Sequence, residues 1–261
     1  MSKVGIVIPT IFSRPAYLPL AAKSIRAAGD AFVMVSSPEP TPEQQKLIDQ
    51  LVHDELVDQH LIETDGLPLA LKISEALAAL PEECEYIGWL GDDDLLLPDA
   101  LLVTSRLLDS RADAVMAFGG VDYIDKDGEK LFTNASSQSH EKLLSFGPQL
   151  IPQPGSLWRR DAFEVVGGLS GEFDLAFDFD LFRKLSKRGR LIHLPITLAQ
   201  FRWHADSLSV KRRWRSVSEA SRVRRKHYNF PMRILWPLWE PWVMLATWLA
   251  GKLVSTRYGS R

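Results

Sequence analysis

Short apolar runs alternate with helix-like segments through the first half of the chain, and this alternation constrains the fold more than any other feature. The apolar runs are residues 3–9, 31–35, 86–90 and 114–118, and the helix-like segments begin near residues 15, 42, 67 and 98. Such β-branched runs are typical of strands buried on both faces of a parallel sheet. Strands that alternate with helices through short loops predict an α/β, Rossmann-like domain with an open, mainly parallel sheet.

The composition is that of a folded protein with one or two domains. The chain has 261 residues, 46% hydrophobic and 25% charged, which is enough apolar material for a core. Cys84 is the only cysteine, which excludes a disulfide scaffold and a metal site built from cysteines alone. The first ten residues lack the layout of a secretory signal, so we expect a cytoplasmic protein.

Charge divides the chain into two parts. Residues 1–200 hold 18 Lys and Arg against 30 Asp and Glu, whereas residues 201–261 hold 13 against 3 and contain six of the eight tryptophans. We therefore expect an acidic α/β domain over residues 1–210 and a basic, Trp-rich helical extension over residues 211–261.

The third apolar run leads directly into Asp92, Asp93 and Asp94. Carboxylates this close repel each other unless a cation lies between them. Oxygen ligands suit Mg²⁺ or Mn²⁺, which commonly bridge protein carboxylates to substrate phosphates. The alternative is a solvated acidic loop that caps the helix beginning near Pro98, and the three aspartates alone do not decide between the two.

Five segments occur in an order that resembles the family 2 glycosyltransferases, which have the nucleotide-sugar-dependent GT-A fold. They are KVGIVIPTIFSRPAYLPLAAKS (3–24), YIGWLGDDDLLLPDAL (86–101), SLWRRDAFEVVGGL (156–169), FDFDLFRKL (177–185) and FRWHADSLS (201–209). The agreement of five motifs over about residues 3–209 makes the resemblance specific. It implies an inverting transferase that moves a sugar from a nucleoside diphosphate, UDP first among the candidates, to a hydroxyl of a lipid-linked or cell-envelope glycan.

The resemblance implies a nucleotide site at the end of the first strand. The residues matched to it are Pro9, Thr10, Arg14, Asp65 and Asp92. Ser36 stands where many relatives carry an aspartate that contacts the base, so uracil, thymine and guanine all stay open.

The same resemblance implies a metal site for Mn²⁺ or Mg²⁺. Asp93 and Asp94 match the acidic motif known as DXD, but its first acidic position is Gly91 here, so which aspartates bind the metal stays open. His204 is expected to complete the metal site or to contact the diphosphate, and Arg202 to pair with phosphate or brace the acidic cluster.

Asp178 matches the carboxylate that activates the acceptor. An acceptor hydroxyl is a poor nucleophile until a base takes its proton, and a positioned base is worth about 10²–10⁴ in rate. The alternative role is helix capping; Asp180, two residues along, is the weaker candidate for the base. The residues expected on the acceptor side are Gln153, Gly155, Ser156 and Trp158, although Trp158 fits a core position equally well.

Two other functions compete with sugar transfer. A nucleotidyltransferase also needs an α/β sheet and metal-binding carboxylates, but residues 9–15 (PTIFSRP) lack the glycine-rich loop typical of that class. A non-catalytic, membrane-bound module that binds nucleotide sugars is the third possibility.

The extension has the composition of a segment that lies on a membrane surface. Residues 211–226 contain eight Lys or Arg, and residues 230–250 mix Trp and aliphatic residues with three prolines. The longest uncharged stretch, residues 241–251, is shorter than the ~20 residues that cross a bilayer. We expect a protein peripheral on the inner face of the cell membrane. Packing on the body or on a second copy, as a homo-oligomer, is the main alternative. Nucleic acid is not an expected partner, because the body is acidic.

Overall fold

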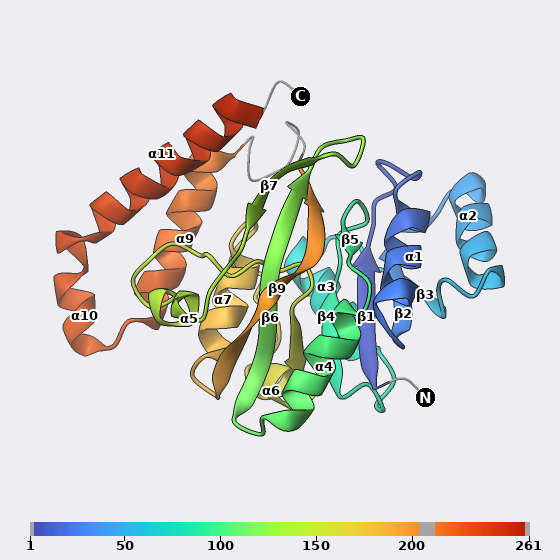
Figure 1. The fold of residues 1–261 in the computed structure, drawn as a ribbon, viewed down its shortest axis with the longest axis horizontal. Helices are drawn as coiled ribbons and strands as arrows, with labels where there is room; N and C mark the ends of the chain where they lie inside the picture. The colour runs from blue at the N-terminus through green and yellow to red at the C-terminus, as the bar shows by residue number, and fades with distance from the viewer. Residues whose placement is uncertain (1–2, 204–211, 259–261) are drawn as a thin grey trace.

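One twisted sheet runs through the protein, with helices on both faces (Figure 1). The computed structural model describes residues 3–203 and 212–258. Its strands are β1 (Val4–Pro9), β2 (Phe32–Ser37), β3 (Gln59–Ile62), β4 (Tyr86–Trp89), β5 (Leu95–Leu96), β6 (Ala114–Ile124), β7 (Lys130–Asn134), β8 (Leu157–Arg159) and β9 (Arg190–Arg202). Their order within the described residues is β3-β2-β1-β4-β8-β6-β9-β5, with β7 paired to β6.

The sheet is parallel in its first half and mixed in its second. β3, β2, β1 and β4 pair in parallel, as predicted from the alternation of strands and helices. β8 is antiparallel to both β4 and β6, and β7 and β5 are antiparallel to their neighbours, while β6 and β9 are parallel. The predicted α/β class is therefore confirmed, and the antiparallel strands are an addition that the sequence pattern did not reveal.

Helices cover the sheet on both sides. They are α1 (Leu18–Ala28), α2 (Pro42–His53), α3 (Leu69–Ala78), α4 (Ala100–Ser110), α5 (Ser139–Leu143), α6 (Arg160–Val165) and α7 (Phe177–Leu185), followed by α9 (Arg213–His227), α10 (Phe230–Leu235), η1 (Trp236–Leu238) and α11 (Glu240–Tyr258). Thr41 caps α2 through a capping box with Gln44, close to the predicted helix start near residue 42. The polar stretch 138–149 contains the short helix α5.

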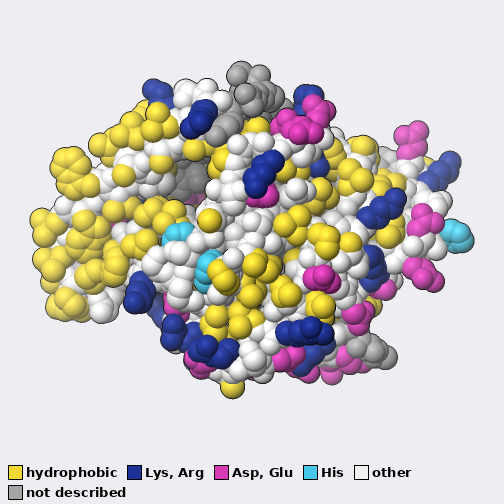
Figure 2. Space-filling model, in the orientation of Figure 1, with side chains coloured by type: hydrophobic (Ala, Val, Ile, Leu, Met, Phe, Trp, Pro, Cys, Tyr) yellow, Lys and Arg dark blue, Asp and Glu magenta, His cyan; other side chains and the backbone are white. Residues whose placement is uncertain are grey.

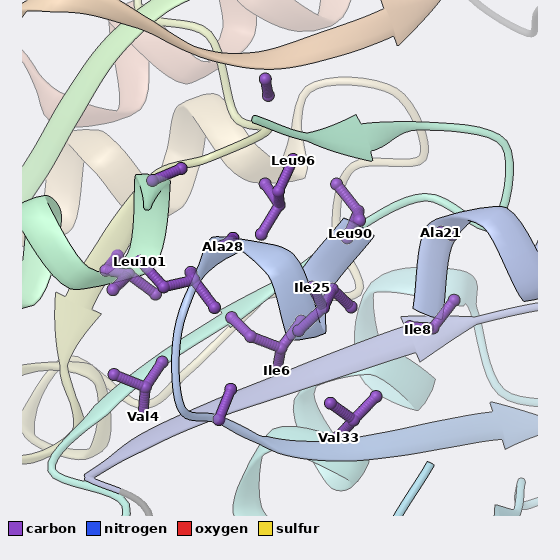
Figure 3. Packing of buried hydrophobic residues seen from close by; sticks show 14 of the residues in the cluster. Val4, Ile6, Ile8, Ala21, Ile25, Ala28, Val33, Leu90, Leu96 and Leu101 are labelled. Carbon is purple, nitrogen blue, oxygen red and sulfur yellow. The ribbon is translucent and has the colours of Figure 1, made fainter. Parts of the chain in front are cut away.

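The core lies in two layers because successive side chains of a strand point to opposite faces. Val4, Ile6 and Ile8 of β1 pack against α1 and α4 on one side (Figure 3). Val7 of the same strand belongs to the layer on the other side, with α3, α6 and α7. Residues 4–8 of β1 are thereby all buried, which is why this strand has a continuous apolar sequence.

β6 continues well past residue 118, where the predicted strand ended. Gly119 and Gly120 interrupt the apolar run, but they let the neighbouring strands approach closely: a Cβ on Gly119 would lie 2.7 Å from the Ile196 carbonyl oxygen of β9. The strand ends at the Asp125–Gly128 turn, which closes an antiparallel hairpin with β7. This long β6–β9 pair forms one wall of the site described below.

The extension begins with a helix that is part of the body. Val223 of α9 is fully buried among the core residues of α7. Glu219 of α9 accepts hydrogen bonds from the backbone N–H groups of Leu175 and Ala176, at 2.7 and 3.3 Å, just before α7. The proposed boundary at residue 210 thus separates two charge regions, but α9 packs against both α7 and α11.

A buried ion pair joins α9 to α11. Arg224 and Glu240 are 1% and 0% exposed, and the guanidinium donates several hydrogen bonds to the carboxylate, including Nε to Oε1 at 3.0 Å. Arg224 Nη1 also donates to the Gly147 carbonyl oxygen at 3.1 Å, and the Tyr228 hydroxyl donates to Glu240. The pair fixes α11 relative to the body.

We predict that Glu240→Ala lowers the free energy of unfolding by about 3–5 kcal/mol, because it leaves the Arg224 charge buried without its partner. Urea unfolding followed by circular dichroism measures this loss. Glu164→Ala is the control, since it removes the exposed end of the Arg160–Glu164 pair and should barely move the midpoint. Equal midpoints for the two variants would contradict the structural role of the buried pair.

Candidate functional site

Two adjoining cavities open where β1 and β4 end. One, of about 390 Å³, is lined by Pro9, Thr10, Glu63 and the three aspartates. The other, of about 290 Å³, is lined by Asp94, Tyr123, Gln149 and Asp178. Trp89, Asp94, Gln153, Phe177 and Phe201 line both cavities and form the partition between them. The site therefore lies at the carboxyl ends of the parallel strands, where α/β sheets bind ligands.

The loop after β1 holds the first aspartate. The Thr10 hydroxyl donates to Asp92 Oδ2, and Thr10 Oγ1 also accepts the Phe12 backbone N–H at 2.9 Å. Phe12 has a positive φ of 54°, so the chain turns sharply there. Burial raises the pKa of Asp92, with the Asp93 charge adding to the effect and the Thr10 hydrogen bond opposing it.

Arginines hold the other two aspartates from either side. Arg14 donates to Asp93 Oδ2 at 3.4 Å. The Arg202 backbone N–H donates to Asp94 Oδ1 at 2.9 Å, and its Nε donates to the Asp93 carbonyl oxygen at 3.0 Å. Burial, together with the neighbouring Asp93 charge, raises the pKa of Asp94 well above its ordinary value. The predicted role of Arg202 in bracing the acidic cluster matches these contacts.

The acidic cluster has the donor set of a hard divalent cation. Asp92 and Asp93 are half-buried on the cavity wall, and Asp94 is 4% exposed at the point where the two cavities meet. No group of three His, Cys, Asp or Glu side chains is arranged around a common centre in residues 3–203 and 212–258.

Asp178 lies on the wall of the second cavity, at the start of α7. Its Oδ2 accepts a hydrogen bond from Gln149 Nε2 at 2.8 Å, and its Oδ1 accepts the Phe179 backbone N–H at 2.7 Å. Burial raises the pKa of this carboxyl, against the lowering effect of both hydrogen bonds. A carboxylate with a raised pKa is a better base, so the position suits general-base chemistry.

Asp180 is held in a different environment. It is fully buried, accepts a hydrogen bond from His227 Nε2 at 2.8 Å, and lies 3.3 Å from the ammonium groups of both Lys184 and Lys226. Burial alone would raise its pKa, but these partners together lower it to about 2. Asp180 is therefore a structural anion that ties α7 to α9.

Comparison with solved structures identifies the fold. A mannosyltransferase from Pyrobaculum calidifontis, in complex with GDP-Man and Mn²⁺, matches with a TM-score of 0.66 at 14% identity, over 100% of this chain and 76% of that one. Residues 1–349 of S. aureus TarS, in complex with UDP-GlcNAc, match with a TM-score of 0.60 at 11% identity, over 86% of this chain and 71% of that one. The chain has the GT-A fold of the family 2 glycosyltransferases.

Sequence comparison gives a weaker match in the same direction. No protein-family model matches the chain. The hyaluronan synthase of Pasteurella multocida is 26% identical over 129 residues, which are 49% of this chain and 13% of the synthase. The chain also spans only 39% of a longer TarS structure, so it corresponds to a part of these relatives.

The GT-A structure brings together most of the predicted donor and metal residues. Pro9, Thr10 and the three aspartates line the first cavity, and Arg14 contacts Asp93 from outside it. Asp65 does not lie there: it is exposed on the turn after β3. His204 lies outside the described residues.

The predicted acceptor residues divide in the same way. Gln153 lines both cavities and donates to the Trp89 carbonyl oxygen at 2.8 Å. Trp158 is fully buried in the core, 5.1 Å from Trp89 in an edge-on contact, so its prediction as an acceptor contact was wrong. Gly155 and Ser156 are buried behind Gln153 and line neither cavity in the described part of the chain.

The structure adds two candidate functional residues, Glu63 and Gln149, that the sequence patterns did not indicate. Glu63, 8% exposed, lines the first cavity, accepts a hydrogen bond from the Ser36 hydroxyl at 3.1 Å and pairs with Lys72 at 2.9 Å. Gln149 orients Asp178 from a segment predicted as a loop. Glu63 directly follows β3, a four-residue strand that the apolar pattern did not reveal, so the sequence carried no signal for its placement.

We predict that Asp180→Asn costs about 2 kcal/mol of unfolding free energy at pH 7, because the folded pKa of about 2 lies below the ordinary 3.8. A depressed carboxyl pKa stabilises the fold above the unfolded pKa. That contribution disappears as the pH falls from about 5 to about 2. Urea unfolding of wild type and variant across this range measures the difference, which should shrink toward acid. A difference that stays constant with pH would contradict the assignment.

Proposed function

We propose that this chain is an inverting, metal-dependent glycosyltransferase that moves a sugar from a nucleoside diphosphate to a hydroxyl of a glycan or glycolipid acceptor. The proposal rests on one observation. Asp94, in the loop after β4, and Asp178, in the first turn of α7, line the same cavity. A metal-binding carboxylate and a candidate base then face the same reacting centre, as a single displacement requires. The GT-A fold of the chain supports this choice over a nucleotidyltransferase.

Asp178 is the base in this proposal. Its carboxylate accepts the proton of the acceptor hydroxyl while the oxygen attacks the anomeric carbon from the face opposite the diphosphate. The bond between that carbon and the diphosphate oxygen breaks, the oxygen keeps the electron pair, and the configuration inverts. Gln149 orients the carboxylate, and each carboxylate oxygen keeps a second lone pair for the acceptor hydroxyl.

Asp93 and Asp94 are the proposed ligands of Mg²⁺ or Mn²⁺, with Asp92 toward the ribose. When bound, the ion would neutralise charge that develops on the leaving diphosphate. Mn²⁺ in the Pyrobaculum mannosyltransferase complex supports a metal in this fold. His204 remains a proposed third ligand.

The nucleotide is proposed to lie along Pro9 and Thr10, and the base near Glu63 and Ser36. A carboxylate at that corner accepts the ring N–H that uracil, thymine and guanine all carry. UDP is the first candidate; the relatives include complexes with UDP-GlcNAc and with GDP-Man. Asp65, on the exposed turn nearby, is kept only as a candidate for an outer contact.

The acceptor is proposed to enter the second cavity, past Gln149 and Gln153. A lipid-linked or cell-envelope glycan is the class implied by the family resemblance. A lipid-linked acceptor requires the enzyme to work at a bilayer surface, on the cytoplasmic face in this proposal. A homo-oligomer formed through the extension stays the alternative arrangement.

We predict that Asp178→Asn lowers turnover by more than about 100-fold while the affinity for donor stays nearly unchanged, since Asn keeps the shape but cannot take the proton. Transfer is followed with a panel of UDP-, GDP- and dTDP-sugars, and donor affinity by calorimetry. Asp49→Asn, on the exposed face of α2, is the matched control. Turnover of the Asp178 variant above a tenth of wild type would exclude this residue as the base.

We predict that Asp93→Asn weakens Mn²⁺ and nucleotide binding together. Losing an outer-shell partner of a metal ligand costs about 10–100-fold in metal affinity, and losing a ligand should cost at least as much. Calorimetric titration of Mn²⁺, with and without UDP, measures the change, and EDTA should abolish transfer. Unchanged manganese affinity of the Asp93 variant would show that the metal site lies elsewhere. Donor binding by the wild-type protein without any turnover would favour the non-catalytic binding module.

A further inference from the structure

The last helix, α11, is apolar on the side that faces solvent. It lies beside α9, and Arg213 of α9 donates to Ser255 at 2.7 Å across the contact. On the outer side, Trp242, Leu245, Leu249 and Leu253 recur every three to four residues and are 70%, 47%, 45% and 70% exposed. A helix that is apolar all round is ordinarily buried on every side. The exposed outer face of α11 therefore indicates a surface that binds a further partner.

The same surface continues onto the two elements before α11. Phe230, Ile234 and Leu235 of α10 and Leu238 of η1 are between 47% and 77% exposed. Figure 2 shows hydrophobic side chains gathered over the lobe formed by α10 and α11, at the edge of the molecule far from α2. We call this surface the tail face: Phe230, Ile234, Leu235, Leu238, Trp242, Leu245, Leu249 and Leu253.

The exposed charges on α9, α10 and α11 are all basic, although Arg215, Arg222 and Lys226 of α9 pair with Asp174 and Glu172 of the body. Residues 211–261 contain two acids, Glu219 and Glu240, and both are buried in hydrogen bonds or ion pairs. The basic residues Arg225, Arg233 and Lys252 are exposed, and Arg225 and Lys252 lie over the rings of Trp236 and Trp248 at 4.9 and 5.3 Å. Exposed basic and apolar groups without exposed acids match an anionic lipid surface. Two copies of the same face would instead oppose like charges.

The helix geometry agrees with a segment that lies on the bilayer. α11 has 19 residues and is roughly 28 Å long at 1.5 Å per residue. In the part of the chain that the structure describes, no helix is long and apolar enough to cross a membrane. The buried Arg224–Glu240 pair also holds α11 against the body, so the tail face is presented as a fixed surface.

We propose that the tail face docks the protein onto bilayers that contain anionic lipid, with α10, η1 and α11 lying in the interface. Arg224, which pairs with Glu240 at the start of α11, also donates to the Gly147 carbonyl, two residues before Gln149, so the docking arm is joined to the loop that lines the second cavity. The proposed docking depends only on the tail face. The further idea that docking brings the enzyme to a lipid-linked acceptor rests on the proposed function.

The test compares two variants of the full chain with the same change in charge. Leu238→Glu, Trp242→Glu and Leu253→Glu are combined in the tail variant, since each side chain is at least 70% exposed. Val52→Glu, Ile62→Glu and Val165→Glu are combined in the control, at exposed positions on the body. Flotation with vesicles of phosphatidylglycerol and phosphatidylcholine, and with phosphatidylcholine alone, is measured at low and high salt, without nucleotide sugar.

Wild type and control should bind the anionic vesicles, less at high salt, and the tail variant should bind roughly tenfold less or weaker still. Equal binding of the two variants, no binding by wild type, or equal binding to both vesicle types would overturn the proposal. A wild-type dimer in light scattering that the tail variant alone loses, without vesicle binding, would assign the face to a second copy. Because no sugar donor is present, the result does not depend on transferase activity.

Discussion

The site depends on how three adjacent aspartates are held at the end of one strand. Each carboxylate has its own donor: the Thr10 hydroxyl for Asp92, Arg14 for Asp93 and the Arg202 backbone N–H for Asp94, while Arg202 Nε donates to the Asp93 carbonyl oxygen. The same guanidinium donates to the Asp125 and Lys126 carbonyls and lies 4.3 Å from the Tyr17 ring. One side chain at the end of β9 thus joins the acidic loop, the β6–β7 turn and the start of α1. That arginine thus helps to fix the loops around the first cavity, together with the buried side chains of Phe12, Leu90 and Leu96.

The first helix of the basic extension, α9, packs into the body and contributes to its core. Glu219 holds the backbone that leads into Asp178, and Arg224 holds the loop that carries Gln149. Both contacts come from α9, which a boundary drawn from charge alone assigns to the extension. Removing everything after residue 222 would therefore take core residues with the apolar arm. Substitutions confined to the tail face therefore separate membrane docking from folding more clearly than a truncation does.

Local sequence patterns predicted the strands and helices in the first half of the fold. The second half depends on pairing between strands that lie far apart in the sequence. β1, β2 and β4 are continuous apolar runs, and Thr41 starts its helix by a local capping box, so both follow from neighbouring residues. β9 and the second half of β6 stabilise each other across about 80 residues, and Gly119, which permits their close contact, looks like a strand end in sequence. For the site, the motif order singled out the three aspartates and Asp178, which line the two adjoining cavities. It misplaced Trp158 because a tryptophan that stacks on a sugar and one that fills a core are identical in sequence.

Asp178 and Asp180 show why burial and partners, not residue type, assign roles at this site. Both belong to the first turn of α7, and burial raises the pKa of each. For Asp180 one imidazole and two ammonium groups overcome that effect and keep the carboxylate charged. For Asp178 the partners are an amide and a backbone N–H, which are neutral and leave the pKa raised. Helical geometry directs two residues this close to different sides, so one turn supplies both a fixed anion facing α9 and a carboxyl group of raised pKa facing the cavity.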